Sequence, residues 1–317
     1  MAEGFDLDGK TAIVTGAGNG LGRAEALALA ACGANLVLND LPAPVGAQSV
    51  VEAVADQIRA AGGRAVVVAG DVSQWSTGEA MLAAATATFG GLDIVVNNAG
   101  VLRDRMVFSM SEHEWDTVLA VHLRGHFITT RLATAHWREQ SKVSGGGVYA
   151  RIVNTSSEAF LLGSSGQPNY AAAKAGIVAL TVTTARSCAR YGVRANAICP
   201  RARTDMTADL MGEAPSGQVD PLAPEHVAPL VAYLASPAAA DINGEVFVVH
   251  GGVAAVLEPP RLRAVFRAAE HGSPDGMWSN DSIAAALGPA FEGTGDSAGF
   301  ACEATLPLAN QTIGFGE

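Results

Sequence analysis

Residues 11–22 of the chain, TAIVTGAGNGLG, join a short apolar run to a glycine-rich turn. The run at 11–15 has the apolar and β-branched residues of a buried strand, and the Ala- and Leu-rich segment 21–32 that follows the turn has helical periodicity. Glycines between a strand and a helix let the backbone turn tightly and approach a pyrophosphate, whose charge then lies on free N–H groups at the helix N-terminus. We therefore predict a nucleotide-binding loop that includes Gly16, Asn19, Gly20, Leu21 and Gly22.

Six further apolar runs bounded by turn residues follow along the chain, and helix-like segments separate most of them. The expected strands are 11–15, 35–40, 65–70, 92–97, 151–155, 194–199 and 245–249. The expected helices are 21–32, 46–61, 76–89, 112–139, 169–191 and 225–235. Strands of continuous hydrophobicity that alternate with helices predict an α/β fold, a doubly wound (Rossmann) parallel sheet of about seven strands with helices on both faces.

The composition changes after the last expected strand, at Glu258-Pro259-Pro260. We expect a main domain over 1–257 and a C-terminal extension over 258–317, which packs on the core or on a neighbouring subunit because so short a piece buries little core alone. The extension contains two helix-like pieces, 261–271 and 274–288.

Bulk properties exclude several classes of protein. Of the 317 residues 49% are hydrophobic and 16% charged, yet no run approaches the roughly 18 apolar residues of a membrane span. The net charge of −11 disfavours nucleic acid and anionic membranes as partners. The four cysteines lack metal-ligand spacing, and the first ten residues do not resemble a secretory signal, so we expect no metal and a cytoplasmic location.

Asp40 ends the second expected strand, where a carboxylate accepts hydrogen bonds from both ribose hydroxyls of an adenosine and repels a 2′-phosphate. No Arg or Lys adjoins it within 39–44, so NAD is predicted in preference to NADP. Asp71 and Val72, after the third strand, are candidates for the adenine site. The candidates for the ribose site, after the fourth strand, are Asn98, Ala99 and Gly100.

Tyr170 and Lys174 are four residues apart in the expected helix 169–191 and therefore share one face. A lysine charge near a phenol lowers the pKa of the phenol toward neutrality, as a proton acceptor for an alcohol requires. Ser157 follows the fifth strand, where its hydroxyl can bond the reacting oxygen, and the adjacent Ser156 is the competing candidate.

The glycine-rich loop TGAGNGLG, the acid at the end of the second strand, NNAG at 97–100, Ser157 and the stretch Tyr170-Ala-Ala-Ala-Lys174 together resemble the short-chain dehydrogenase/reductase family over residues 5–252. The resemblance implies Tyr170 as general acid/base, Lys174 as the residue that holds the nicotinamide ribose and tunes the tyrosine, and Ser157 as the residue that orients the substrate oxygen. It also implies cofactor contacts from Pro200 and Thr204, although Arg201 stands where the family usually has glycine.

His122 is a second departure, because most members of the family have asparagine at this place. The asparagine acts partly through its backbone carbonyl, so histidine can preserve that role. Two interpretations stay open: His122 joins the catalytic group, or it only packs beside the helix.

Four stretches refine the resemblance, namely 37–41, 97–105, 121–125 and 224–229. They are similar to the (3R)-hydroxyacyl-CoA dehydrogenase domain of peroxisomal type 2 multifunctional enzymes, which also oxidise 17β-hydroxysteroids, and to bacterial relatives of steroid side-chain degradation. The resemblance implies NAD-dependent oxidation of a 3-hydroxyacyl-CoA, with steroid-bearing acyl chains included, and a homodimer or homotetramer. The alternatives are a 17β-hydroxysteroid dehydrogenase acting on free steroid and, remotely, a non-catalytic NAD-binding scaffold.

Two loops complete the predicted substrate site. The segment 204–220 mixes methionine and leucine with glycine and proline, which favours a mobile lid over a bulky apolar substrate, or else an ordinary surface excursion. Coenzyme A phosphates need local cations in so acidic a protein. The candidates are Arg103, Arg105, Arg201 and Arg203, each of which can instead pair with nearby acids such as Asp104 and Asp205.

Overall fold

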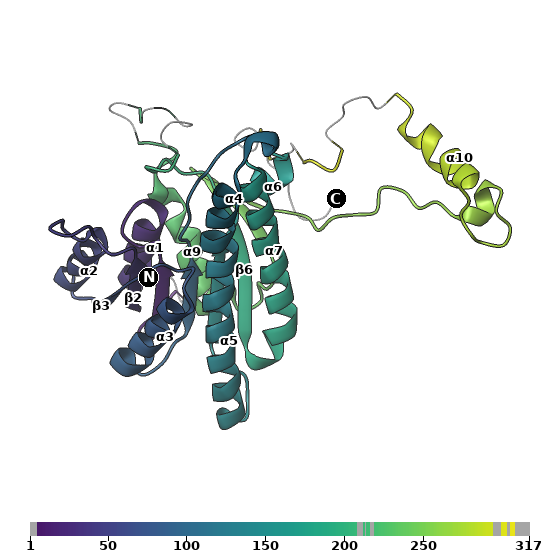
Figure 1. The fold of residues 1–317 in the computed structure, drawn as a ribbon. Coiled ribbons are helices and arrows are strands. Elements are labelled where there is room, and N and C mark those ends of the chain that lie inside the picture. The colour runs from purple at the N-terminus through teal and green to yellow at the C-terminus, as the bar shows by residue number, and fades with distance from the viewer. Residues whose placement is uncertain are drawn as a thin grey trace. The chain divides into compact units, whose positions relative to one another are not determined.

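The strands of the chain form one sheet in a computed structural model. The structure describes residues 5–207, 212, 214–215, 219–293, 299–302 and 305–307. The parallel strands are β1 (Thr11–Thr15), β2 (Asn35–Asp40), β3 (Arg64–Ala69), β4 (Ile94–Asn97), β5 (Ala150–Thr155), β6 (Val193–Pro200) and β7 (Val246–His250). An eighth strand, β8 (Val253–Val256), completes the order β3-β2-β1-β4-β5-β6-β7-β8. The doubly wound α/β fold expected from the sequence is therefore present (Figure 1).

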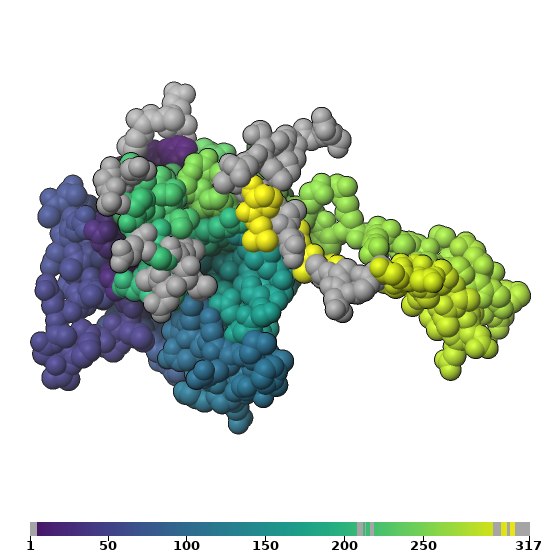
Figure 2. Space-filling model, turned by 90° about the horizontal axis from the view of Figure 1, so that it is seen from above, coloured from purple at the N-terminus to yellow at the C-terminus, as the bar shows by residue number. Residues whose placement is uncertain are grey.

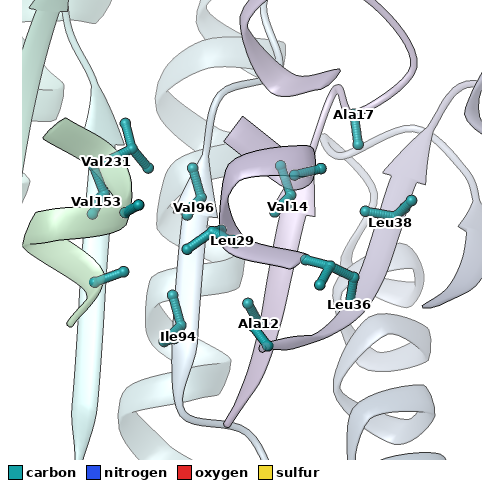
Figure 3. Close-up of a cluster of buried hydrophobic side chains, with 14 of the residues drawn as sticks. Ala12, Val14, Ala17, Leu29, Leu36, Leu38, Ile94, Val96, Val153 and Val231 are labelled. Carbon is teal, nitrogen blue, oxygen red and sulfur yellow. The ribbon is translucent and has the colours of Figure 1, made fainter. Parts of the chain in front are cut away.

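Helices cover both faces of this sheet, and alternate residues of β1 to β6 enter two separate cores. The first core packs α1 (Gly20–Ala31), α2 (Val50–Ala60) and α9 (Ala228–Ala235) on the sheet. Figure 3 shows Leu29 of α1 beside Val14 and Val96, and Val231 of α9 beside Val153. The second packs α3 (Trp75–Phe89), α5 (Gly125–Ser144) and α7 (Pro168–Cys188) on the other face. Burial on both faces explains why the strands are almost uniformly apolar.

Buried polar side chains link the middle of the sheet to two of these helices. The Asn97 amide donates to Asn154 Oδ1 at 2.9 Å and accepts from the Thr129 hydroxyl of α5. The Asn154 amide donates in turn to Thr181 Oγ1 of α7 at 2.8 Å. These four residues, which we call the polar ladder, are all at least 95% buried.

The strand order places a switch point between β1 and β4. From β1 the chain winds outward through β2 and β3, and β4 then begins the half of the sheet on the other side of β1. Sheets of this type bind ligands at the carboxyl ends of the strands, beside such a switch point. Figure 2 shows the same structure from above as a space-filling model.

Several boundaries differ from the sequence-based expectation. The strand β8 was not expected. It forms because a turn at Gly251 and Gly252 lets the chain reverse direction and pair antiparallel with β7. The expected helix at 112–139 is divided into α4 (Glu112–Leu119), a π-turn η2 (Ala120–Arg124) and α5. A short helix, α6 (Ala159–Leu162), also escaped prediction.

The segment after β8 forms a compact unit of its own, Glu258–Glu303, whereas Met1–Leu257 and Ala304–Glu317 form the other. The prediction of a helix over 261–271 is wrong, because only the 3-10 turn η6 (Ala268–His271) forms there. Helix α10 (Asn280–Phe291) begins later than the expected 274, where the Ser279 hydroxyl accepts a hydrogen bond from the Ser282 N–H. No helix within the described part of the chain has the length and apolar character needed to span a membrane.

Candidate active site

The glycine-rich loop after β1 is shaped by close backbone contacts. Gly16 and Gly20 have φ of 63° and 51°, in the left-handed region that favours glycine. A Cβ on Gly22 would lie 2.1 Å from the Gly16 carbonyl oxygen, so only glycine fits there. The Asn19 side chain does not cap α1, which leaves the first amides of the helix available to an anionic group.

Asp40 is bound to this loop through its carboxylate. Its Oδ2 accepts the Gly18 N–H at 2.8 Å, and its Oδ1 accepts the Leu41 N–H at 2.8 Å. Two backbone donors therefore fix the direction of the carboxylate at the end of β2. The close backbone contact at Gly22 leaves room for the pyrophosphate of a dinucleotide, and the fixed Asp40 carboxylate fits its adenosine ribose.

The loop after β4 is fastened to the same place. The Asn98 amide donates to the carbonyls of Thr15 and Gly16, at 3.2 and 3.3 Å. The Thr15 hydroxyl accepts the N–H groups of Asn98 and Ala99. Asn98 therefore supports the glycine-rich loop, and contacts of Asn98, Ala99 and Gly100 with a ribose stay a prediction.

Two other predicted cofactor segments lie at carboxyl ends of strands. Asp71 accepts the Ser73 N–H at 2.8 Å, and Val72 is buried. Thr204, after β6, lies so near Gly20 that a Cβ on the glycine would be 2.9 Å from the threonine methyl. The loop that begins at Pro200 thus reaches the glycine-rich loop.

The predicted lid at 204–220 falls only partly within the described residues. Of this segment the structure describes Thr204 to Thr207, Gly212, 214–215 and 219–220. Its role as a lid stays a prediction.

Tyr170 and Lys174 lie on one face of α7, in the first turns of the helix. The Lys174 Nζ lies 5.3 Å from the centroid of the Tyr170 ring and donates to the Thr155 carbonyl at the end of β5, at 2.6 Å. A hydrogen-bonding interaction with Ser157 lowers the pKa of Tyr170, and the Ser156 hydroxyl donates instead to the Lys174 carbonyl at 2.9 Å. The structure thus brings Ser157, Tyr170 and Lys174 together and gives Ser156 a supporting contact.

The expected drop in the pKa of Tyr170 is wrong for the protein alone. Burial raises the pKa of this phenol to about 12, and the hydrogen bond from Ser157 opposes the rise. Burial also lowers the pKa of Lys174 to about 7. The physical reason is that α7, β5 and β6 remove both groups from water, a cost that the sequence spacing did not reveal.

His122 occupies the π-turn η2 and joins the loop after β4 to the tyrosine. Its Nε2 lies 3.0 Å from the Val101 nitrogen and 2.9 Å from the Val101 oxygen, and its ring meets the Tyr170 ring edge to face at 5.2 Å. Burial and the Lys174 charge hold the pKa of His122 well below its ordinary value, so the imidazole is neutral. A Cβ on Gly100 would lie 2.4 Å from this ring, which explains the glycine.

The next helical turn carries a second buried histidine, His126. Burial and the Lys174 charge lower the pKa of His126 to about 3. Whether the His122 side chain takes part in the reaction stays a prediction.

Sequence reasoning missed two residues that support the site. Asn169 is fully buried, and its amide donates to the carbonyls of Arg103 and Glu114, so it fastens the loop after β4 to the start of α7. Glu158 is buried beside Ser157 and binds Arg201 through both carboxylate oxygens. An asparagine directly before Tyr170 and an acid directly after Ser157 were the available signals.

The four arginines proposed for coenzyme A differ in their partners. Arg201 and Arg203 pair with Glu158 and Asp220, at 2.6 and 2.8 Å. Arg105, with its side chain 62% exposed, pairs with Glu114 at 3.2 Å. Arg103 donates to the neighbouring Leu102 carbonyl. The acids that pair with these arginines are Glu114 of α4, Glu158 after β5 and Asp220, and not the expected Asp104 and Asp205.

Comparison with known proteins gives a consistent picture. Residues 10–214 match the family model described as short chain dehydrogenase. The chain is 55% identical over 293 residues to "Hydroxyacyl-CoA dehydrogenase ChsB1" of Mycobacterium tuberculosis, and the alignment covers 91% of this chain and 90% of that protein. It is 41% identical over 256 residues to "Peroxisomal multifunctional enzyme type 2" of Mus musculus, covering 80% of this chain but 33% of that protein. A crystal structure of a short chain dehydrogenase from Mycobacterium avium matches with a TM-score of 0.78 and 45% identity, over 89% of this chain and 96% of that one.

Proposed function

The chain belongs to the short chain dehydrogenase family, and we propose that it oxidises the hydroxyl group of a 3-hydroxyacyl-CoA to a ketone with NAD. The observation that carries the substrate class is 55% identity, over 91% of the chain, to a protein named hydroxyacyl-CoA dehydrogenase. The meeting of Ser157, Tyr170 and Lys174 at the carboxyl end of β5 supports the reaction type. Acyl chains that carry a steroid nucleus are included in the proposal.

In this proposal the side chains divide the proton chemistry among them. The Ser157 hydroxyl donates a hydrogen bond to the substrate oxygen and orients it, and the Tyr170 phenolate accepts the hydroxyl proton as the C=O bond forms. The Lys174 ammonium stabilises the phenolate by its charge. NAD, when bound, supplies the acceptor for the hydride that leaves the carbinol carbon. Gly16, Asn19, Gly20, Leu21 and Gly22 would hold its pyrophosphate and Asp40 its adenosine ribose.

Coenzyme A requires cations that the substrate can reach, and the structure changes the choice among the arginines. Arg201 and Arg203 already share hydrogen bonds with carboxylates whose side chains are at most 16% exposed. Arg103 and Arg105, on the loop between β4 and α4, have more solvent access. We therefore propose Arg103 and Arg105 as the phosphate-binding pair.

Steady-state rates on matched substrates test the proposal. With NAD, we expect a larger kcat/KM on a 3-hydroxyacyl-CoA than on a free 17β-hydroxysteroid. The Arg103→Ala/Arg105→Ala variant should lose about tenfold or more in kcat/KM on the acyl-CoA and little on the free alcohol, since charge-assisted contacts contribute about 1.5–3 kcal/mol. A free steroid as the better substrate would favour the hydroxysteroid dehydrogenase alternative, and equal losses on both substrates would contradict the phosphate role.

The exposed aromatic side chains on the long helices support a homo-oligomer. Trp75, Trp115 and Phe127, on α3, α4 and α5, are 37–46% exposed. Burial of such rings against a second copy would stabilise a dimer or tetramer. Light scattering after gel filtration measures the state, and a monomer at micromolar concentration would contradict it. A cytoplasmic location also stays a prediction.

A further inference from the structure

Arg201 and Glu158 form a forked, largely buried ion pair between the loops that follow β6 and β5. The Arg201 Nε and Nη2 atoms donate to Glu158 Oε2 and Oε1, at 2.6 and 2.8 Å. The side chain of Glu158 is 8% exposed and that of Arg201 is 23% exposed. A fork of two parallel hydrogen bonds fixes direction as well as distance, and a lysine could not reproduce it.

The arginine is itself anchored on two further sides. Its backbone N–H donates to the Val249 carbonyl of β7 at 3.0 Å, which ties the start of the loop to the sheet. Its Nη2 also donates to the carbonyl of Thr305, a buried residue of the returning C-terminal segment. The guanidinium therefore has little freedom to follow Glu158 if the glutamate moves.

Ser157 lies between this ion pair and a second anchor. On its N-terminal side, the Ser156 N–H donates to the Ile198 carbonyl at 2.7 Å, and the Ser156 hydroxyl donates to the Lys174 carbonyl. On its C-terminal side, Glu158 is the N-cap residue of α6, and the Ser157 hydroxyl accepts the Ala159 N–H at 3.2 Å. Movement of Glu158 would therefore turn the peptide that carries Ser157.

We propose that Glu158 and Arg201 are a positioning pair for Ser157, which hold its hydroxyl toward Tyr170 and thereby set the rate of alcohol oxidation. The inference rests on the role that the proposed function gives to Ser157. It assigns a purpose to the arginine that stands where the family usually has glycine. Neither residue touches the substrate oxygen in this proposal, and both act through the serine.

A shift of Ser157 has a measurable effect on acid–base behaviour. The hydrogen bond from Ser157 lowers the pKa of Tyr170, whereas burial raises it. When the serine turns away, the causes that remain are burial and the interactions with Cys199 and Asp104, all of which raise the pKa of the phenol. The pH at which oxidation becomes fast should then rise as well, an effect that simple loss of folding stability would not produce.

The test uses Glu158→Gln, Arg201→Lys and Ser157→Ala in the full chain, with whichever secondary alcohol the unmodified protein oxidises fastest. We expect Glu158→Gln to lower kcat about tenfold, to leave KM for NAD within about twofold, and to move the alkaline rise in rate upward by about half a pH unit. Arg201→Lys keeps the charge but not the fork, so it should lose less, about threefold. In the Ser157→Ala background, Glu158→Gln should change kcat by less than about twofold, because no hydroxyl remains to be positioned.

The control is Glu139→Gln, which breaks the exposed pair of Glu139 with Lys142 on α5 and should leave kcat and the pH profile unchanged. Two results would overturn the inference: a lower melting temperature for Glu158→Gln and Arg201→Lys with unchanged kcat, or the same tenfold loss in the Ser157→Ala background. If Glu158→Gln does not fold, Arg201→Lys decides by the same criteria. Wild-type activity of Ser157→Ala would instead refute the serine's role in the proposed function.

Discussion

The backbone N–H of Gly18 donates to Asp40 Oδ2 at 2.8 Å, so the glycine-rich loop and the acid at the end of β2 form one hydrogen-bonded unit. A Cβ on Gly18 would lie 2.8 Å from the same oxygen. The second oxygen accepts the Leu41 N–H, and the carboxylate is therefore fixed before any ligand arrives. A preorganised acceptor binds a ribose diol without a reorganisation cost and opposes a phosphate in the same place.

The fixed carboxylate leads to a prediction about cofactor choice. The protein should show a larger kcat/KM with NAD than with NADP, and Asp40→Ala should narrow this preference by about tenfold or more because the repulsion of a 2′-phosphate is lost. The matched control is Asp241→Ala, which removes an exposed acid from a surface loop. An unmodified protein that uses NADP equally well or better would refute the assignment of Asp40.

The proton acceptor can be tested without disturbing the packing around it. Tyr170→Phe keeps the ring against His122 but removes the phenol oxygen. Turnover should fall by at least about 100-fold while NAD affinity, measured by fluorescence titration, stays nearly constant. Retention of a tenth of the activity would remove Tyr170 from this role. Lys174→Ala should differ, because it should weaken NAD binding as well as turnover.

A single methyl group should be enough to disrupt the glycine-rich loop. Gly22→Ala places a Cβ 2.1 Å from the Gly16 oxygen, so the backbone must move, at a cost of about 1–3 kcal/mol or more in the free energy of unfolding. NAD affinity should fall with it. Gly146→Ala is the control, since a Cβ there meets nothing within 4 Å, and its φ is not in the left-handed region. Calorimetry with and without NAD measures both effects. Normal NAD affinity in Gly22→Ala would contradict the role of this loop in binding the pyrophosphate.

Glu25 of α1 gives a prediction about pH. It is fully buried, neither carboxylate oxygen has a hydrogen-bond partner in the described structure, and burial raises its pKa from 4.5 to about 8. Between these pH values the folded protein keeps a proton that the unfolded chain releases, so the stability contribution of Glu25 falls as the pH rises from about 5 to about 8.

Glu25→Gln removes this titration while it keeps the side-chain shape. The melting temperature of the variant relative to the unmodified protein should therefore increase between pH 5 and pH 8. Exposed Glu225→Gln should show no such trend. If the difference in melting temperature between Glu25→Gln and the unmodified protein were constant with pH, the raised pKa of Glu25 would be contradicted. The carboxyl would then be hydrated or hydrogen-bonded in solution.

The parts of the molecule that could be predicted are those encoded within short stretches of sequence. The strands β1 to β7 follow from apolar runs, and the loop at Gly16–Gly22 from its spacing. Tyr170 and Lys174 share a helix face because they are four residues apart. In each case the interacting groups are close in the chain, and their geometry follows from local backbone structure.

The parts that escaped prediction depend on contacts between distant residues. Arg201 meets Glu158 from 43 residues away, and Asn169 reaches Arg103 from 66 residues away. The raised pKa of Tyr170 is a property of its burial, which no spacing reveals. The strand β8 needs only four residues of pairing to β7, and its sequence, VAAV, is equally suited to a helix or a loop.

The polar ladder of Asn97, Asn154, Thr129 and Thr181 has a consequence for how the layers find their alignment. Small side chains such as alanine and threonine give a helix few protrusions toward the sheet. Apolar contacts alone would therefore allow the helix to pack on the sheet in more than one register. If α5 or α7 slipped by one turn, Thr129 or Thr181 would leave an asparagine of the sheet without its partner. Each orphaned buried group costs about 1–3 kcal/mol, so the misaligned packings are penalised while the aligned one is not. The ladder thus fixes the alignment of α5 and α7 on the sheet. Helix α7 also carries Tyr170, and α5 continues the π-turn η2 that carries His122.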